Sequence, residues 1–204
     1  MRVLVACEMS GRVTDALLDR GVDAWSCDIL DCVGKHPERH FKAPVQRVLA
    51  SQAWDALIAF PPCTHLSNAG QAYRHEKMLD GRLADGYNFF MSLWEYPIRI
   101  KALENPLGIV SSQKQLDTFL PGREALPPTQ IVSWEMFGSQ RKKRTCLWLQ
   151  GLPPLLPTAP RGHGKSFERW AIGSCPGQKV QRSKLSVHFA QAIASQWAPY
   201  LGGN

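Results

Sequence analysis

Four acidic or thiol side chains directly follow apolar, strand-like runs in the first half of the chain. They are Glu8, Asp28, Cys63 and Glu104, and Glu8 is followed closely by Ser10 and Gly11. The carboxyl ends of parallel strands meet at one edge of an α/β sheet, and ligands bind beyond that edge. We therefore expect these side chains to surround one pocket of a size suited to a nucleotide-like ligand.

Cys63 and Glu104 form the reactive pair of this set. Cys63 directly follows Pro61-Pro62, whose rings restrict the backbone and so fix the direction of the thiol. A thiolate beside a carboxyl group can attack an electron-poor ring while the acid protonates, or hydrogen-bonds, a ring nitrogen. Taken alone, Cys63 is more often a buried structural cysteine and Glu104 a helix-capping acid, so the prediction depends on the two residues together.

Asp28 and the first loop indicate the kind of cofactor. An acid at the end of the second strand can accept hydrogen bonds from the two hydroxyls of a ribose. The loop CEMSGRV has one glycine, whereas a pyrophosphate-binding loop has the pattern G-x-G-x-x-G. The single glycine therefore counts against a dinucleotide and is compatible with a cofactor that has no phosphate group.

The elements that must position these residues alternate along the chain. Apolar runs predict strands at residues 3–6, 23–27, 54–60, 98–103, 130–134 and 145–149. Helical spacing predicts helices at residues 13–20, 45–51, 84–96 and 188–197. Residues 31–45, 64–86 and 152–160 are expected to be loops, and the second of these is long enough to close over a bound base. The pattern predicts an α/β fold with a mostly parallel sheet and helices on both faces.

Length and composition fit a globular protein. The 204 residues suffice for one domain, and with 44% apolar and 20% charged residues the chain can bury a core. No apolar run approaches the roughly 18 residues of a membrane helix. The five-residue apolar start, 3–7, reads as a strand and not as a signal peptide. Six cysteines without a secretion signal predict free thiols and a cytoplasmic protein.

The positive charge is concentrated near the C-terminus. Residues 139–184 hold ten basic side chains and one acidic side chain, a net charge of +9, while the whole chain has +7. The remainder therefore carries a net charge of −2. Such a stretch suits a polyanion, although a solvated surface explains the charge equally well.

Cys27, Cys32, His36 and His40 raise a zinc alternative. Their spacing, Cys-x4-Cys-x3-His-x3-His, could supply four tetrahedral ligands. Structural zinc sites usually have closer cysteine pairs, and Pro37 interrupts the histidine segment. We therefore assign no metal and expect a buried Cys27 followed by a polar loop.

Several motifs together resemble those of the DNA cytosine-5 methyltransferases, and most closely those of short phage and prophage proteins of this type. FPPCTHLSNAG is similar to the catalytic Pro-Cys motif, ALENP to the Glu-Asn motif, and SQRKKRTCLWL to a motif of a glutamine and alternating basic residues before a strand. VLVACEMSG and AWSCD stand where the family binds S-adenosylmethionine. The resemblance covers roughly residues 1–150 and implies a Rossmann-like S-adenosylmethionine-dependent methyltransferase fold.

The resemblance also implies roles for individual residues. Cys63 would add to carbon 6 of cytosine, Glu104 would hold ring nitrogen 3, and Lys142 and Arg144 would face the site, with Arg144 at the cytosine carbonyl. The residues implied at the cofactor are Glu8, Ser10, Gly11, Asp28, Pro61 and Ser186. Those expected to contact double- or single-stranded DNA are Ser67, Arg74, Arg141, Lys143, Arg161, Lys165, Arg182 and Lys184.

The chain also departs from the family. FKAPVQRVL lacks the acid expected at the adenine amine, for which Asp31 or a backbone group could substitute. Only residues 151–180 lie where a target-recognition region is expected. We therefore expect one domain over residues 1–204, with a catalytic and cofactor core at 1–150, a short basic loop segment at 151–180 and a C-terminal helix at 181–204, and little sequence specificity.

Three other functions are compatible with these residues. The same chemistry could act on RNA or on a free nucleotide. The missing adenine-binding acid and the single glycine of the first loop would also suit a degenerate module that binds nucleic acid without turnover. A cysteine hydrolase would pair the thiol with a histidine, for which His65 and His188 are the candidates.

Overall fold

One seven-stranded sheet organises the chain. The computed structural model describes residues 1–160 and 185–203. The strands are β1 (Arg2–Ala6), β2 (Asp23–Asp28), β3 (His40–Lys42), β4 (Ala56–Ala59), β5 (Ile100–Asn105), β6 (Gln130–Ser133) and β7 (Arg144–Gln150). Their order is β3-β2-β1-β4-β5-β7-β6, and β7 runs antiparallel to both of its neighbours. This order is typical of the Rossmann-like methyltransferase fold, so the expected α/β class with a mostly parallel sheet is confirmed.

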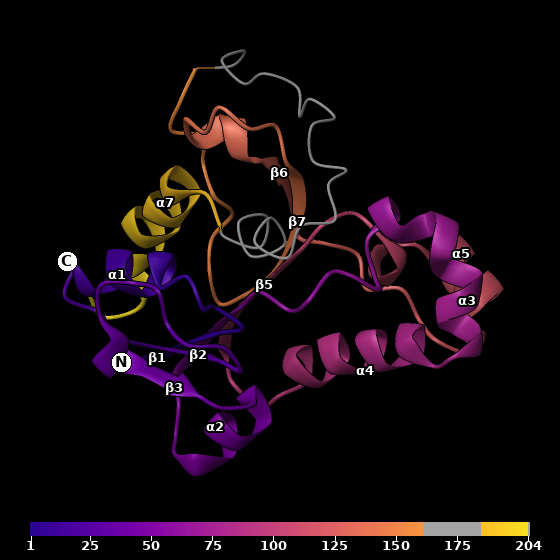
Figure 1. The fold of residues 1–204 in the computed structure, drawn as a ribbon. Helices are drawn as coiled ribbons and strands as arrows, with labels where there is room; N and C mark the ends of the chain where they lie inside the picture. The colour runs from indigo at the N-terminus through magenta and orange to yellow at the C-terminus, as the bar shows by residue number, and fades with distance from the viewer. Residues whose placement is uncertain (161–184, 204) are drawn as a thin grey trace.

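Helices cover both faces of this sheet. They are α1 (Arg12–Leu18), α2 (Val45–Ser51), α3 (Arg74–Leu79), α4 (Arg82–Trp94), α5 (Gln113–Phe119) and α7 (Val187–Trp197). Short 3-10 turns are η1 (Pro37–Arg39), η2 (Asn68–Tyr73), η3 (Ile109–Ser111), η4 (Trp134–Phe137) and η5 (Ala198–Tyr200). In Figure 1, α1 and α7 lie together on one side of the sheet, whereas α2 and α4 lie on the other.

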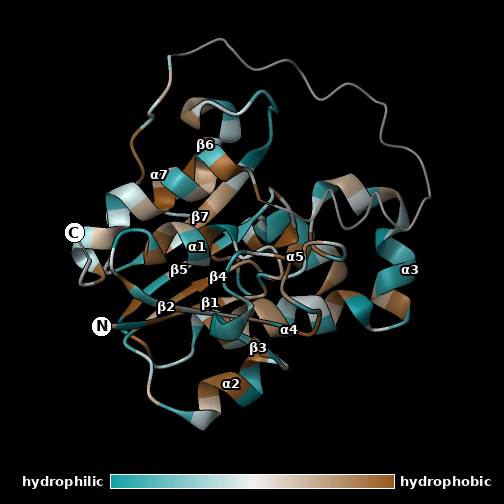
Figure 2. Ribbon diagram, turned by 60° about the vertical axis from the view of Figure 1, so that its left-hand side comes forward, coloured by the Kyte–Doolittle hydropathy of each residue, from teal (hydrophilic) through white to brown (hydrophobic). Residues whose placement is uncertain are grey.

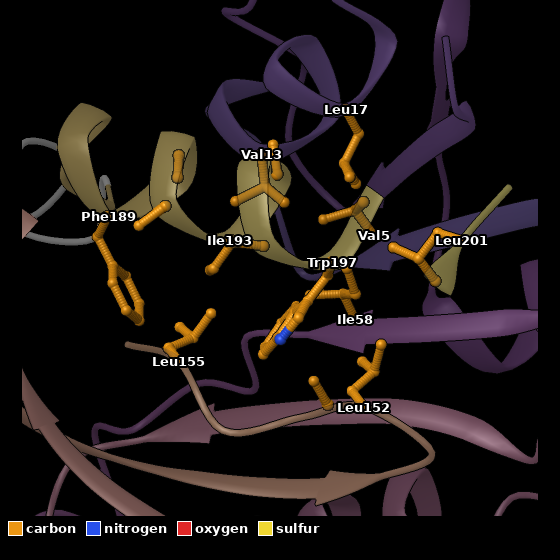
Figure 3. Close-up of a cluster of buried hydrophobic side chains, with 14 of the residues drawn as sticks. Val5, Val13, Leu17, Ile58, Leu152, Leu155, Phe189, Ile193, Trp197 and Leu201 are labelled. Carbon is orange, nitrogen blue, oxygen red and sulfur yellow. The ribbon is translucent and has the colours of Figure 1, made fainter. Parts of the chain in front are cut away.

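Alternation along the strands divides the core into two apolar layers. Val3 and Val5 of β1 pack toward α1 and α7, whereas Leu4 and Ala6 pack toward α2 and α4. Figure 3 shows the first layer, in which Trp197 lies among aliphatic side chains. Its indole nitrogen donates a hydrogen bond of 2.9 Å to the Pro153 carbonyl. The apolar residues of β1 and β4 appear as brown ribbons at the centre of Figure 2.

Two segments that were predicted as loops contain regular secondary structure. Residues 31–45 contain the short edge strand β3, which pairs with β2. Residues 64–86 contain η2, α3 and the start of α4, so this segment is helical for most of its length. Helix α5 was not predicted, because its single buried apolar residue, Leu116, leaves no helical period to detect.

Candidate active site

A cavity of about 510 Å³ lies at the carboxyl ends of the central strands. This volume is within the usual range for small-molecule sites. Six of the residues predicted for catalysis or for the cofactor line it: Glu8, Ser10, Asp28, Pro61, Cys63 and Glu104. The structure therefore brings the polar ends of β1, β2, β4 and β5 together, as the strand-end argument predicted.

Glu8 caps the first helix from inside this cavity. Its side chain is buried and accepts hydrogen bonds from the backbone N–H of Val13 at 2.7 Å and of Thr14 at 3.3 Å. The hydroxyls of Thr14 and Ser10 also donate to it. Burial raises the pKa of Glu8 to about 7, against the opposing effect of these bonds. The donors that would bind a phosphate at a helix N-terminus are thus already engaged by a carboxylate.

Asp28 lines the same cavity, at the end of β2, which pairs with β1. Its carboxylate accepts a hydrogen bond of 3.0 Å from the N–H of Leu30. Ile29 and Leu30 also line the cavity and are 68% and 48% exposed. A carboxylate beside exposed apolar side chains suits a ribose with an attached ring, so these residues fit a nucleoside group that carries no phosphate.

Asp31 does not supply the missing adenine-binding acid. Its carboxylate pairs with the exposed Lys42 at 2.8 Å and is not among the residues that line the cavity. Gln46, at the start of α2, does line the cavity. The sequence motif FKAPVQRVL therefore contributes an amide at this wall in place of a carboxylate.

The segments that carry Cys63 and Glu104 are hydrogen-bonded to each other. Cys63 is half-buried and follows β4, whereas Glu104 is near the end of β5. The side-chain amide of Asn105 donates a hydrogen bond of 2.9 Å to the carbonyl of Pro61. Parallel pairing of β4 with β5 holds the two strand ends at the same level. The Cys63 and Glu104 segments are therefore fixed relative to each other by backbone and amide contacts.

A second set of contacts joins the chain after Cys63 to the chain after Glu104. Asn68 N–H donates to the Leu107 carbonyl, and Ile109 N–H donates to the Leu66 carbonyl, both at 3.0 Å. Ser67 pairs with Gly108 as an isolated antiparallel bridge. A Cβ atom at Gly108 would lie 2.0 Å from the Leu66 carbonyl oxygen, so only glycine permits this approach.

The basic residue beside Glu104 is Lys143. Its ammonium lies 3.6 Å from Glu104 Oε1 and 4.4 Å from the centre of the Trp134 ring. The Thr145 hydroxyl donates a hydrogen bond to the same Glu104 oxygen. Lys143 lines the cavity, whereas Lys142 and Arg144 are exposed and do not. Lys142 and Arg144 were predicted to face the site, with Lys143 on the other side. The residues do alternate, but it is Lys143 that faces the cavity. A shift of one residue in an extended segment moves every side chain to the opposite side.

The exposed basic residues lie on the turn between β6 and β7. Lys142 lies 3.5 Å from the carboxylate of Glu135, and the side chains of Arg141 and Arg144 are exposed. These three residues remain candidates for contacts with phosphates. Arg161, Lys165, Arg182 and Lys184, predicted for the same role, lie outside the described residues.

Two residues predicted to contact DNA are buried. Arg74 is 1% exposed, and its guanidinium donates to the Ser67 carbonyl at 3.1 Å and to the side chain of Gln115. Ser67 is 8% exposed. Neither side chain therefore lies on a surface that nucleic acid could reach in this conformation, which corrects the prediction.

Two predicted cofactor residues lie outside the cavity lining. Gly11 begins α1 with φ 66°, and its Cα atom lies against Gly34, which leaves no room for a Cβ atom on either residue. Ser186 is the N-cap of α7, and its neighbour Leu185 lines the cavity instead. Gly11 thus permits close packing of the 32–35 loop on α1.

The structure gives no support to the zinc alternative. His40 Nδ1 lies 2.8 Å from the Ser26 hydroxyl, and His36 Nδ1 lies 3.0 Å from a Glu38 oxygen. Cys27 is buried in the apolar core, and burial raises the pKa of its thiol to about 12. Within residues 1–160 and 185–203, no three histidine, cysteine or acidic side chains gather as metal ligands would.

The histidines needed by a cysteine hydrolase are elsewhere. His65 is not among the residues lining the cavity, and its Cβ atom lies close to Gly86 of α4. His188 lines a separate groove of about 660 Å³ between α1 and α7. Within residues 1–160 and 185–203, no histidine lines the cavity with Cys63, as the thiol–histidine pair of a cysteine hydrolase would require.

The sheet order and the cavity at its carboxyl edge define a protein of the Rossmann-like methyltransferase fold. No family model and no curated protein matches the chain. One similar solved structure is described as a DNA modification methyltransferase encoded within a prophage of E. coli. It has 14% identity and a TM-score of 0.42, over 73% of this chain and 46% of that one.

A second similar structure is that of a mutant of DNMT2 from Spodoptera frugiperda. It has 12% identity and a TM-score of 0.38, over 81% of this chain and 57% of that one. The chain thus spans about half the length of these two proteins. None of the helices that the structure describes is long and apolar enough to cross a membrane.

Proposed function

We propose that the chain transfers a methyl group from S-adenosylmethionine to carbon 5 of cytosine in DNA. The observation that carries this proposal is the presence of Cys63 and Glu104 in the cavity that also contains Asp28. A nucleophile, an acid and a nucleoside-binding carboxylate in one cavity suit a reaction between a base and a nucleoside cofactor. The resemblance of the surrounding motifs supports cytosine as the base.

Cys63 and Glu104 have different roles in the proposed reaction. The Cys63 thiolate attacks carbon 6 of cytosine, and the electron pair of the 5,6 double bond makes carbon 5 nucleophilic. Glu104 holds or protonates ring nitrogen 3, so charge that develops on the ring is neutralised. After carbon 5 has gained its methyl group, loss of its proton to a base restores the double bond and expels the Cys63 thiolate.

The carboxyl ends of β1 and β2 are suited to hold the cofactor. S-adenosylmethionine supplies the electrophilic methyl group when it is bound. Asp28 would accept hydrogen bonds from its ribose, and Ile29 and Leu30 would lie against its adenine, whose edge the Gln46 amide would meet. Because Glu8 occupies the donors of α1, a phosphate-bearing cofactor is disfavoured here.

Lys143 and Thr145 would position Glu104, and the Lys143 ammonium would also meet the cytosine carbonyl. The positioning roles are supported by their contacts with Glu104 Oε1, and the carbonyl contact by the place of Lys143 in the cavity lining. Arg141, Lys142 and Arg144 would contact phosphates, together with the basic residues of 161–184. Each phosphate contact lowers the slope of log affinity against log salt by about 0.9 on duplex DNA, so affinity should depend strongly on salt and little on sequence.

The experiment is methyl-group labelling with matched substrates. Purified protein and methyl-labelled S-adenosylmethionine are incubated with duplex DNA, single-stranded DNA, tRNA and deoxycytidine nucleotides, and the nucleosides are identified by mass spectrometry. We expect 5-methylcytosine in DNA. Product in RNA or nucleotides alone would reassign the substrate, and DNA binding without cofactor binding or product would indicate a non-catalytic binding protein.

A further inference from the structure

Helix α3 buries two cationic side chains that the proposed chemistry does not use. Arg74 is 1% exposed and Lys77 is 7% exposed. Neither lines the cavity with Cys63. Burying a charge costs free energy unless nearby polar groups compensate it. The contacts of these two residues therefore indicate what the charges hold in place.

Both cations are bonded to the chain that follows Cys63. The Lys77 ammonium donates a hydrogen bond of 2.8 Å to the carbonyl of Thr64. The Arg74 guanidinium donates to the carbonyl of Ser67 at 3.1 Å, and more weakly to the Asn68 side chain at 3.4 Å. The two residues thus hold carbonyls one and four positions after the nucleophile.

Acidic partners are lacking for these cations in the described part of the chain. Arg74 has the neutral amide of Gln115 as its other polar contact and lies over the Phe119 ring at 5.8 Å. Burial lowers the pKa of Arg74, as expected for a charge without a carboxylate partner. Because each charge is compensated by backbone and amide oxygens, movement of the loop would leave a buried cation with fewer hydrogen bonds.

A buried lysine elsewhere in the chain provides a comparison. Lys101 is 4% exposed, and its ammonium donates to the carbonyls of Trp94 and Tyr96 at the end of α4. These hydrogen bonds, and its contact with the Trp94 ring, do not involve residues 63–70. Lys101 and Lys77 therefore use the same kind of bond, but only Lys77 holds the loop of the nucleophile.

We propose that Arg74 and Lys77 are positioning residues that hold residues 64–68 in one conformation before any substrate binds. This proposal rests on the proposed role of Cys63. The nucleophile is then followed by a segment that is already ordered. Part of the substrate's binding energy is thereby not spent on ordering this loop.

Amide hydrogen exchange tests the proposal without relying on catalysis. The reporting amides are Leu66 and Ser67, which donate to the Cys63 carbonyl, and Gly70, which donates to the Ser67 carbonyl. We expect Lys77→Met to speed their exchange by about tenfold. Lys77→Arg should retain most of the protection, because it can still donate to the Thr64 carbonyl, and the matched control Lys101→Met should leave these amides unchanged.

Arg74→Lys is a second variant in case Lys77→Met does not fold. It keeps the charge but cannot bond Ser67 and Gln115 together, so exchange at Ser67 and Gly70 should again be faster. Unchanged exchange in both variants, or an equal increase in Lys101→Met, would overturn the proposal. The exchange result decides this whether or not the wild-type protein methylates DNA.

Steady-state kinetics test whether the conformation of residues 64–68 affects catalysis by Cys63. If the wild-type protein transfers methyl groups, Lys77→Met should lower kcat by about tenfold and leave the KM for S-adenosylmethionine unchanged. Lys101→Met should leave both unchanged. An increase in the cofactor KM with unchanged kcat would assign Lys77 to the fold of the pocket and contradict a role in presenting Cys63.

Discussion

The Asn105 side-chain amide donates a hydrogen bond of 2.9 Å to the carbonyl of Pro61. Asn105 directly follows Glu104, and Pro61 is two residues before Cys63. Asn105 is 1% exposed, so solvent does not compete for this bond. One buried amide thus connects the segment of Glu104 to the segment of Cys63, and the relative position of these two segments is set by the fold itself.

The contact of Lys143 with Glu104 predicts that adjacent lysines differ in importance. Lys143→Met should lower kcat/KM by about 10- to 100-fold, because it removes a charge 3.6 Å from a buried carboxylate. Lys142→Met, which loses only a partly exposed contact with Glu135, should change kcat/KM by no more than about threefold. Steady-state methylation by the two variants provides the comparison, and a larger effect of Lys142→Met would restore the register expected from sequence.

The close approach of Gly108 to Leu66 predicts a steric effect. Gly108→Ala places a carbon 2.0 Å from a backbone oxygen, so the two loops must separate. We expect a loss of about 1–3 kcal/mol in the free energy of unfolding, measured in urea, and a lower kcat. Gly21→Ala is the control, because its Cβ atom would meet open space and only its φ of +75° is strained. Equal stability and activity of Gly108→Ala would contradict the close approach.

The burial of Glu8 predicts a pH-dependent stability. Its pKa of about 7 lies above the ordinary value of 4.5, so between these values the folded protein binds more protons than the unfolded chain. This contribution is complete below about pH 4.5 and is lost as pH rises toward 7, by up to about 3 kcal/mol. Urea unfolding at pH 5 and pH 7 should show the loss in the wild type and a smaller loss in Glu8→Gln.

The control for this measurement is Glu124→Gln, whose side chain is exposed. It should follow the wild-type profile between pH 5 and pH 7. If Glu8→Gln shows the same slope as the wild type, the carboxyl group of Glu8 is not the group that titrates in this window.

Substitutions of Asp28 and Asp31 are expected to have different effects on the affinity for S-adenosylmethionine. Asp28→Asn removes the carboxylate that lines the cavity and should weaken S-adenosylmethionine binding by about 10- to 100-fold in calorimetry. Asp31→Asn removes an exposed carboxylate paired with Lys42 and should leave the affinity unchanged. Equal affinities of the wild type and Asp28→Asn would place the cofactor elsewhere.

The place of the strand-end residues at one edge of the sheet could be predicted from the sequence, because it follows from the topology of the sheet. Polar residues after apolar runs, such as Asp28 and Cys63, must reach the carboxyl edge of a parallel sheet whatever the packing. The side on which Lys143 projects depends on the register of β7 against β5, and a local pattern does not fix that register. The buried state of Arg74 depends on the packing of α3 against α5, which involves residues about 40 positions apart.

Trapping of the proposed covalent adduct tests the role of Cys63 most directly. DNA that contains 5-fluorodeoxycytidine is incubated with the protein and S-adenosylmethionine, and the mass of the intact product is measured. After methylation, carbon 5 carries fluorine in place of a removable proton, so the thiol cannot be expelled and the adduct persists. We predict one DNA strand attached at Cys63 and no adduct with Cys63→Ser, a variant that should still bind the cofactor. A wild-type protein that forms no adduct while methylating unmodified DNA, or an adduct at another cysteine, would contradict the account.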